Sequence, residues 1–352
     1  MKDIFAKRLK SARLVKGYSL QKLADMLNIS KQMISKYESG KSLPDSTNLI
    51  NIAKALGQNA DYFFRPATVE LGAISFRKKS GLPVKKQKAV EESIIQRVEN
   101  YLSIESILAI KSEFVNPLKN ISADDISKAA EASDIIRKKW ELGHDPIHNV
   151  IELLEANQIK VIEIADADEK FDGLSCVIDG KFPVIVVNKN FNTERKRFTL
   201  LHELGHLVLS IPDNIEDKES ERICHAFAGN MLLPASVLRN EFGSKRDKIS
   251  LQELKVFQKD YGISIQAIIY RLVECGIISK NSQKYFYVRI NTNPELKKDI
   301  DGQRFCETEK SERFYRLIYR ALSQELISIG KAASLLSESV SSIRKNFSVV
   351  ID

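Results

Sequence analysis

The chain has 352 residues, 43% of them hydrophobic, which is enough for two or three domains with packed cores. No apolar run approaches the roughly 18 residues that cross a bilayer, and the N-terminus lacks the apolar stretch of a secretory signal, so we expect a cytoplasmic protein without a membrane partner. Residues 1–90 carry 18 basic and 6 acidic side chains, a net charge of +12, whereas the rest carries 36 basic and 40 acidic ones, a net −4, which suggests that the N-terminal part binds a polyanion. The four cysteines are widely separated, with no Cys-x-x-Cys pair, so we expect reduced thiols.

The spacing of apolar residues predicts four helices near the N-terminus, at residues 3–16, 20–27, 31–38 and 46–56. Gly17 ends the first helix, and Ser19 and Ser30 are placed to cap the second and third through their hydroxyl groups. Asn28 and Ile29 form the tight turn between the second and third helices. Two short helices joined in this way are typical of a helix-turn-helix.

The outward face of the third helix suits the major groove of DNA, because glutamine pairs with adenine and lysine pairs with guanine or phosphate. The side chains that we expect to contact DNA are Gln21, Lys31, Gln32, Ser35 and Lys36. Residues 19–56, which include the run ISKYESG, resemble the XRE/Cro-type helix-turn-helix family. The resemblance implies that residues 1–67 bind double-stranded DNA, with structural roles for Tyr37 and Glu38. A protein-docking bundle is the alternative use of such a fold.

A basic stretch interrupted by proline and glycine, at residues 66–86, predicts a linker that either adds phosphate contacts or is simply solvated. Three further helices are predicted after it, at residues 86–110, 123–140 and 147–156. His144 and His148 are four residues apart, but Pro146 breaks the helical pairing that a metal site would need. We therefore do not expect these two histidines to bind metal.

Alternating and β-branched runs predict three strands, at residues 160–164, 174–178 and 182–187. Asp179-Gly180 marks a hairpin turn between the last two strands. An exposed edge of this small sheet would be able to bind a peptide as an added strand. The sequence does not indicate which strand forms that edge.

The run RFTLLHELGHLVL at residues 197–209 predicts a buried helix, because apolar side chains flank its polar centre on both sides. His202 and His206 are four residues apart and share one face of such a helix, so both can bind one zinc ion. Glu203 lies between them, where it can take a proton from a zinc-activated water as a general base. The combination predicts a zinc-dependent enzyme that hydrolyses peptide bonds.

A catalytic zinc ion needs a third protein ligand, which we expect from a helix predicted at residues 217–228. Glu221 and His225 share a face of that helix. The spacing therefore leaves both a His-His-Glu set and a His-His-His set open, and Cys224 is a further alternative.

The blocks RFTLLHELGHLVL and ERICHAFAGNMLLP resemble the ImmA/IrrE family of zinc metallopeptidases, whose patterns are RxxxAHELGHxxL and ExxAxxFAxxLLxP. The resemblance covers roughly residues 140–275. It implies a gluzincin-like site with the zinc ligands His202, His206 and Glu221, the general base Glu203, and a neighbouring His225 that orients Glu221 or polarises the substrate. Leu201 and Cys224 stand where the family pattern has alanine, and both leave the ligands intact.

Four helices are predicted in the last hundred residues, at residues 251–261, 264–275, 311–322 and 329–347. Residues 286–290 alternate in a way that predicts a short strand, and Ser328 and Ser339 are candidate helix caps. The stretch KAASLLSESVSSIRK resembles another helix-turn-helix-like unit. We expect it to sense a signal, form a dimer, bind substrate or pack against the protease domain.

Together these patterns predict a mainly helical α+β fold. It comprises a five-helix helix-turn-helix domain, a zincin-like metallopeptidase domain with a small β-sheet, and a helical C-terminal region. The predicted segments are residues 1–67 for DNA binding, 68–135 for the linker and its helices, 136–280 for the metallopeptidase, and 281–352 for the C-terminal region.

The resemblances imply a DNA-binding zinc endopeptidase that cleaves a regulatory protein, such as a repressor, to control transcription. The alternative is a helix-turn-helix transcriptional regulator or antitoxin-like repressor whose metal domain is a sensor with little or no protease activity. Glu203 favours the enzyme, because a structural zinc site has no need of a base beside it. The expected partners are duplex DNA, a protein substrate, Zn²⁺ and, where the chain forms a homodimer, a second copy of itself.

Overall fold

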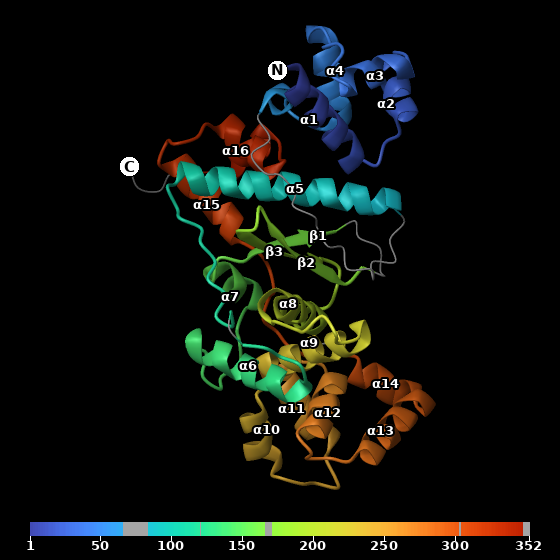
Figure 1. Cartoon of the computed structure of the whole chain (residues 1–352), viewed down its shortest axis with the longest axis vertical. Helices are drawn as coiled ribbons and strands as arrows, with labels where there is room; N and C mark the ends of the chain where they lie inside the picture. Colours follow the sequence, from blue (N-terminus) through green and yellow to red (C-terminus); the bar gives the residue numbers. More distant parts are fainter. Residues whose placement is uncertain (66–83, 120, 166–170, 303, 348–352) are drawn as a thin grey trace. The chain divides into compact units, whose positions relative to one another are not determined.

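The structure of the chain is a computed structural model that describes residues 1–65, 84–119, 121–165, 171–302 and 304–347. Its described part contains seventeen α-helices and a three-stranded sheet, which confirms the predicted mainly helical α+β fold (Figure 1). The chain divides into two compact units. Unit 1 comprises Met1–Glu113, Ile178–Phe182 and Glu312–Asp352, and unit 2 comprises Phe114–Val177 and Pro183–Ser311. Of the linker predicted at residues 66–86, residues 66–83 lie outside the described residues, and the backbone of residues 84–86 begins the helix that follows.

Unit 1 begins with the predicted helix-turn-helix module. Its elements are α1 (Lys2–Val15), α2 (Leu20–Leu27), α3 (Lys31–Glu38), α4 (Ser46–Leu56) and the 3₁₀ helix η1 (Ala60–Phe64). The hydroxyl groups of Ser19 and Ser30 accept hydrogen bonds from backbone N–H groups in the first turns of α2 and α3, as predicted. Asn28 makes the turn between these helices in the left-handed conformation, with φ 53°.

A buried ion pair joins the first and third helices of this module. The guanidinium of Arg13 on α1 donates through Nη2 to Glu38 Oε2 of α3 at 2.8 Å and through Nη1 to the Tyr18 carbonyl at 2.8 Å. Both charged side chains are only about one-tenth exposed. Tyr37 is buried next to them in the apolar core of the module. Tyr37 and Glu38 therefore both hold the fold together.

The remainder of unit 1 consists of four helices. They are α5 (Val84–Ile107), α15 (Arg313–Ser323), α16 (Ile329–Leu336) and α17 (Val340–Asn346). The helix α5 packs against α1, where Arg8 and Glu99 form a buried ion pair, and against α15, where Arg313 donates to Glu105 at 2.8 Å (Figure 1). A separate apolar core forms between α5 and the last three helices.

Unit 2 contains the sheet and the remaining helices. The helices are α6 (Ile126–Lys139), α7 (Val150–Ala156), α8 (Thr193–Val208), α9 (Asp217–Leu232), α10 (Ala235–Phe242), α11 (Leu251–Tyr261), α12 (Ile265–Glu274), α13 (Lys280–Thr292) and α14 (Pro294–Ile300). One large apolar core joins α6, α8, α9 and α12 to the sheet. The helix α12 packs against both α9 and α11.

The sheet has the strand order β1 (Lys160–Ile164), β3 (Phe182–Asn188), β2 (Gly173–Ile178). The outer strand β1 runs parallel to the central strand β3, with Ile162 opposite Val186. Asp179 and Gly180, with φ 50° and 64°, form the predicted turn between β2 and β3. Within the described residues, β1 and β2 are therefore the two edge strands.

Two predictions for the C-terminal part were wrong. Residues 286–290 form no strand, because the Ser279 hydroxyl caps a helix that continues through them, with Ile290 buried on its inner side. Residues 329–347 form two helices instead of one, because Ser337 adopts φ 57° and ends α16 before Ser339 caps α17. The predicted caps Ser328 and Ser339 are both confirmed. No helix of the described part is both long and apolar enough to span a bilayer.

We expect Glu38→Ala to destabilise the N-terminal module by about 3 kcal/mol, because it leaves the Arg13 guanidinium buried without its partner. Hydrogen exchange of the α1 and α3 amides should then accelerate roughly a hundredfold, since about 1.4 kcal/mol corresponds to a factor of ten. Lys41→Ala, at an exposed position of the same module, is the control and should change exchange little. Equal protection in the two variants would contradict a structural role for the pair.

Candidate metal centre

The candidate site lies where α8 and α9 pack closely together. Gly205 of α8 makes this approach possible, because a Cβ atom there would lie 3.2 Å from Phe227 and 3.4 Å from the Cβ of Cys224. The rest of the interface is apolar, with Leu201, Leu204 and Phe227 fully buried. The polar groups at this point are therefore largely withdrawn from water and need partners from one another.

The two predicted metal-binding histidines of α8 face the predicted glutamate of α9. The Nε2 atoms of His202 and His206 are 3.1 Å apart. Glu221 places its carboxylate oxygens 3.3 Å from His202 Nε2 and 3.6 Å from His206 Nε2. The three side chains are 11%, 7% and 20% exposed, respectively. The structure thus brings together the three residues that the sequence predicted as metal ligands.

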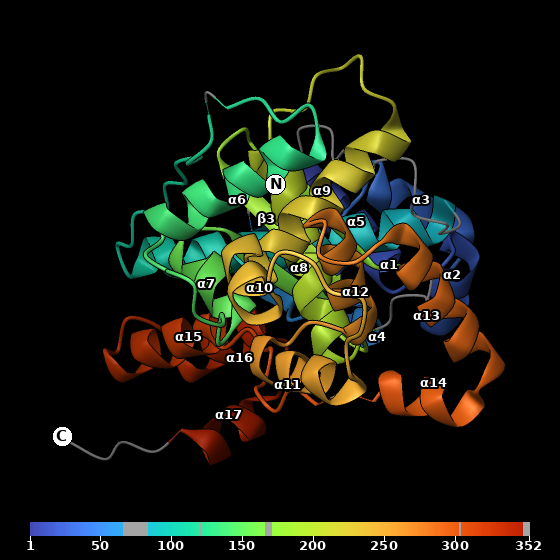
Figure 2. The same ribbon diagram turned by 90° about the horizontal axis from the view of Figure 1, so that it is seen from below.

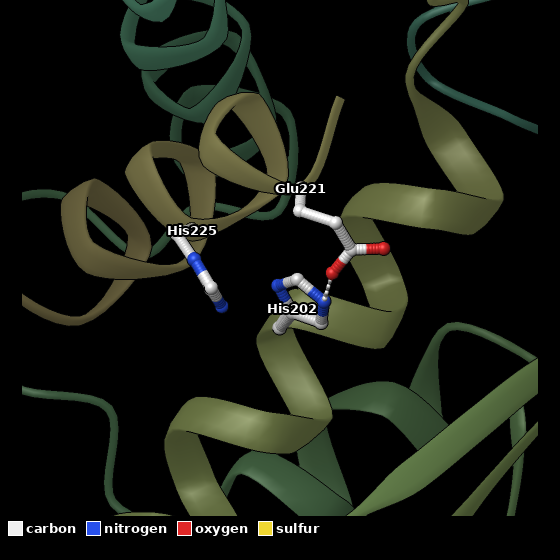
Figure 3. Close-up of side chains that lie close together, drawn as sticks. All are labelled: His202, Glu221 and His225. Carbon is white, nitrogen blue, oxygen red and sulfur yellow. Dashed lines mark ion pairs between the residues drawn. The ribbon is translucent and has the colours of Figure 1, made fainter. Parts of the chain in front are cut away.

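His225 also lies at this site, one turn beyond Glu221 on α9. Its ring is tilted against that of His202, with the centroids 4.5 Å apart, and against Phe198 at 5.7 Å. Figure 3 shows the His202 ring between the Glu221 carboxylate and His225. Ligand atoms of these three residues lie within 4.8 Å of one another, so a metal ion could be held by this set as well. Unlike the other two, His225 is exposed to solvent.

The predicted general base, Glu203, is held from the neighbouring strand. Ser175 on β2 donates a hydrogen bond from Oγ to Glu203 Oε2 at 2.7 Å. Glycine at position 173 lets β2 come this close to α8, because a Cβ atom there would lie 2.8 Å from Thr199 and 3.4 Å from Glu203 Cγ. Ser175 was not predicted from the sequence, because a serine in a predicted strand carries no sign of a partner 28 residues away.

Two cysteines border the site. Cys224 is fully buried, and its Sγ lies 3.2 Å from Nδ1 of His206. Cys176 follows Ser175 on β2, and burial, with a contribution from the nearby Glu203 charge, raises the pKa of its thiol to about 12. Cys176 is therefore a neutral thiol at physiological pH, and it is neither a nucleophile nor a metal ligand in that form.

The donor set fits a divalent metal ion such as zinc. Three groups able to donate lone pairs converge, and two imidazoles with one carboxylate are the ligands of catalytic zinc sites. A Nδ1–H of His206 donated to Cys224 Sγ would leave the lone pair on Nε2, which is the tautomer that a metal requires. The buried Nδ1 of His202 has no hydrogen-bond partner in the described part of the chain.

The predicted DNA-contacting residues lie on the surface of the N-terminal module. Lys31, Gln32, Ser35 and Lys36 form the exposed face of α3. Gln21 on α2 is also exposed and donates from Nε2 to Asp25 Oδ1 at 2.7 Å. His144 and His148 do not join the metal site: His144 contacts Ser236 Oγ through Nδ1 at 3.0 Å, and neither belongs to the described metal-binding cluster.

Comparison with protein families identifies both parts of the chain. Residues 9–63 match the helix-turn-helix family, and residues 154–273 match the IrrE N-terminal-like domain, a peptidase family. The chain thus combines an XRE-type helix-turn-helix domain with an ImmA/IrrE-like domain, as the sequence resemblances predicted. The second family gives a candidate metal-dependent peptidase domain, and His202, Glu203, His206 and Glu221 all fall within the matched range.

The curated relatives match 62 residues of this chain and are named as HTH-type transcriptional regulators. The chain is 42% identical over 62 residues to the SPbeta prophage-derived uncharacterized HTH-type transcriptional regulator YonR of Bacillus subtilis, covering 18% of this chain and 57% of that protein. It is 41% identical over 62 residues to an uncharacterized HTH-type transcriptional regulator of Rickettsia conorii, covering 18% of this chain and 50% of that protein. The match therefore spans about half the length of these relatives. The solved apo form of ComR from S. thermophilus is 12% identical over 98% of both chains, with a TM-score of 0.18, which is too low to support an argument.

We expect substitutions of His206 and His225 to have different effects on zinc binding. His206→Ala removes one of three converging ligands and should abolish stoichiometric zinc, measured by mass spectrometry of the purified chain after dialysis. His225→Ala should retain zinc near one ion per chain, with the affinity reduced by no more than the roughly 10–100-fold of a residue that contacts a ligand. Zinc lost in His225→Ala but retained in His206→Ala would show that the ion uses the other set.

Proposed function

We propose that this chain is a DNA-binding, zinc-dependent endopeptidase that cleaves a regulatory protein, such as a repressor, to control transcription. The convergence of His202, His206 and Glu221 beside Glu203 supports this function most strongly. The match of residues 154–273 to a peptidase family supports it independently. We assign His202, His206 and Glu221 as the zinc ligands.

The chemistry would divide between the metal and the protein. A bound zinc ion would supply Lewis-acid chemistry, polarising the scissile carbonyl and acidifying water. Glu203 would take the proton of the attacking water and pass it to the leaving amine, with its carboxylate held in place by Ser175. His225 is exposed at the rim of the site, where it can donate a hydrogen bond to the substrate.

An extended substrate would reach this site along β2. This strand is an edge of the sheet in the described residues and carries Ser175, which contacts the general base directly. A peptide added to that edge would gain backbone hydrogen bonds and would lie next to Glu203. We therefore propose that the substrate segment is unfolded or locally extended when it is cleaved.

The helix-turn-helix module would hold the protease near its target gene. Lys31, Gln32, Ser35 and Lys36 on α3, with Gln21 on α2, would contact duplex DNA. A repressor bound at the same operator would then be present at a high effective concentration.

The alternative function is a transcriptional regulator whose metal domain senses rather than cleaves. The curated relatives favour this alternative because their names describe transcriptional regulators. A metal site with little or no protease activity would still retain the three ligands but would not need Glu203. The two functions therefore differ in what the loss of this carboxylate does.

Glu203→Gln tests the proposed function directly. It should retain zinc and DNA affinity but reduce proteolysis by about a hundredfold or more, because it removes the general base without changing the size of the side chain. The measurement compares new protein N-termini in cells that express wild type or the variant, with Glu216→Gln as a control at an exposed glutamate. If wild type and Glu203→Gln yield the same N-termini, and reporter transcription responds equally with both, the metal domain acts as a sensor and not as a protease.

Ser175→Ala should lower kcat without loss of zinc. A hydrogen bond to a charged group is worth about 1.5–3 kcal/mol, so a decrease of roughly ten- to a hundredfold is expected when the Glu203 carboxylate is no longer held. Ser175→Thr keeps the hydroxyl group and should restore most of the activity. An unchanged kcat in the alanine variant, with a raised KM alone, would mean that Ser175 serves only substrate binding.

A further inference from the structure

The last two helices repeat the geometry of the N-terminal helix-turn-helix. Ser328 caps α16 by accepting from Lys331 N–H, Ser337 ends it in the left-handed conformation with φ 57° and ψ 35°, and Ser339 caps α17 by accepting from Ser342 N–H. The N-terminal module has this arrangement with the same residue spacing at Ser19, Asn28 and Ser30. The φ and ψ values at Asn28 are 53° and 39°, so the two turns have the same backbone conformation.

The pattern of burial repeats as well. Ala332, Ala333 and Ile343 are buried at the positions that correspond to Leu23, Ala24 and Ile34. Outside this core, Val340, Ser341, Arg344 and Lys345 are exposed on α17 at the positions of Lys31, Gln32, Ser35 and Lys36 on α3. The helix that corresponds to the DNA-reading helix thus presents an equivalent open face.

The first helix of the C-terminal pair, α16, is instead in contact with other parts of unit 1. Arg65 donates from Nη2 to Ser334 Oγ at 3.0 Å, and Asn100 of α5 donates from Nδ2 to the Leu335 carbonyl at 3.1 Å. These contacts fix α16 within unit 1 and involve no residue of α17. Figure 2 shows α17 beside α16 and close to the C-terminus.

A third turn of this kind, between α11 and α12, shows that the backbone turn alone does not determine whether the second helix has an exposed face. Gly262, with φ 59°, and the cap Ser264 join α11 to α12 in the same manner. There, however, Ile265 and Ile269 of α12 stand at the positions of Lys31 and Ser35 of α3, and both are buried. Residues 250–275 carry three basic and three acidic side chains, whereas residues 313–347 carry six basic and two acidic, a net charge of +4.

We propose that α15–α17 is a second helix-turn-helix that contacts the phosphate backbone of duplex DNA through Ser341, Arg344 and Lys345. Exposed arginine and lysine side chains on a helix in a positively charged segment suit binding to phosphate groups. A serine hydroxyl can donate a further hydrogen bond to phosphate. The chain then holds DNA through two elements of unit 1, α3 and α17. This inference goes beyond the proposed function, since it adds a second DNA contact that involves neither the metal site nor the residues of α3.

The test uses the full-length chain and a fluorescent 40-base-pair duplex of mixed sequence, with Kd measured by anisotropy from low to moderate salt. The variant is Arg344→Ala with Lys345→Ala, compared with Lys31→Ala with Lys36→Ala. The control is Lys280→Ala with Lys284→Ala, which removes two exposed positive charges from α13 of unit 2. All three variants change the net charge equally, so a general effect of charge is the same in each.

We expect the α17 variant to weaken binding roughly tenfold near 150 mM salt. It should also reduce the slope of log Kd against log salt by about 1–2, because each lost phosphate contact contributes about 0.9. Combined with the α3 variant, the reduction should be larger than in either alone. If the α17 variant has the same salt slope as the α13 control, the proposal is overturned. This holds also where sedimentation shows that the α17 variant has lost self-association. If the α3 variant binds DNA like the α13 control while the α17 variant is weakened, the result counts against DNA binding by α3 and not against DNA binding by α17.

Discussion

The close approach of α8 and α9 is the constraint on which the rest of unit 2 depends. Gly205 has no side chain to separate the helices, and the backbone of α9 at Cys224 therefore lies against it. This contact sets His202 and His206 opposite Glu221 within an apolar interface. A larger residue at position 205 would separate the groups by displacing Phe227 and Cys224, and each buried polar group would then lack the others. A bound metal ion would offset the cost of placing these groups together, because it would take a lone pair from each of them.

The same reasoning separates what the sequence could predict at the site from what it could not. His202 and His206 share a helical face because they are four residues apart, so local spacing is sufficient. Glu221 is 19 residues from His202, and spacing left His225 and Cys224 open beside it; only the resemblance to a family chose among them. Ser175 could not be predicted at all, because its contact with Glu203 depends on how closely β2 approaches α8. Long-range packing supplied that information, and the local pattern contains none of it.

The fold shows the same division. Capping serines and left-handed residues are local features, so the helices of the N-terminal module lie within a residue or two of their predicted ends. Residues 286–290 were predicted wrongly because so short a run fits both patterns: Phe286, Val288 and Ile290 alternate, whereas Phe286, Tyr287 and Ile290 follow a helical spacing. The cap at Ser279 lies seven residues earlier and extends the helix through them. At Ser337 a serine, rather than the expected glycine or asparagine, takes the left-handed conformation, and the helix break was missed for that reason.

The helix pairs α2–α3, α11–α12 and α16–α17 share one local rule, a capping serine after a left-handed residue, and the rule does not determine their function. What differs is the face that the second helix leaves outside. On α3 this face is basic and open. On α12 the equivalent positions hold the buried Ile265 and Ile269, and on α17 the face is again open and basic. The backbone turn is therefore a structural unit, and the function comes from the charge and exposure of a few side chains on it. In unit 1 the two open faces belong to one compact body, whereas the covered pair supports the metal site through the contact of α12 with α9.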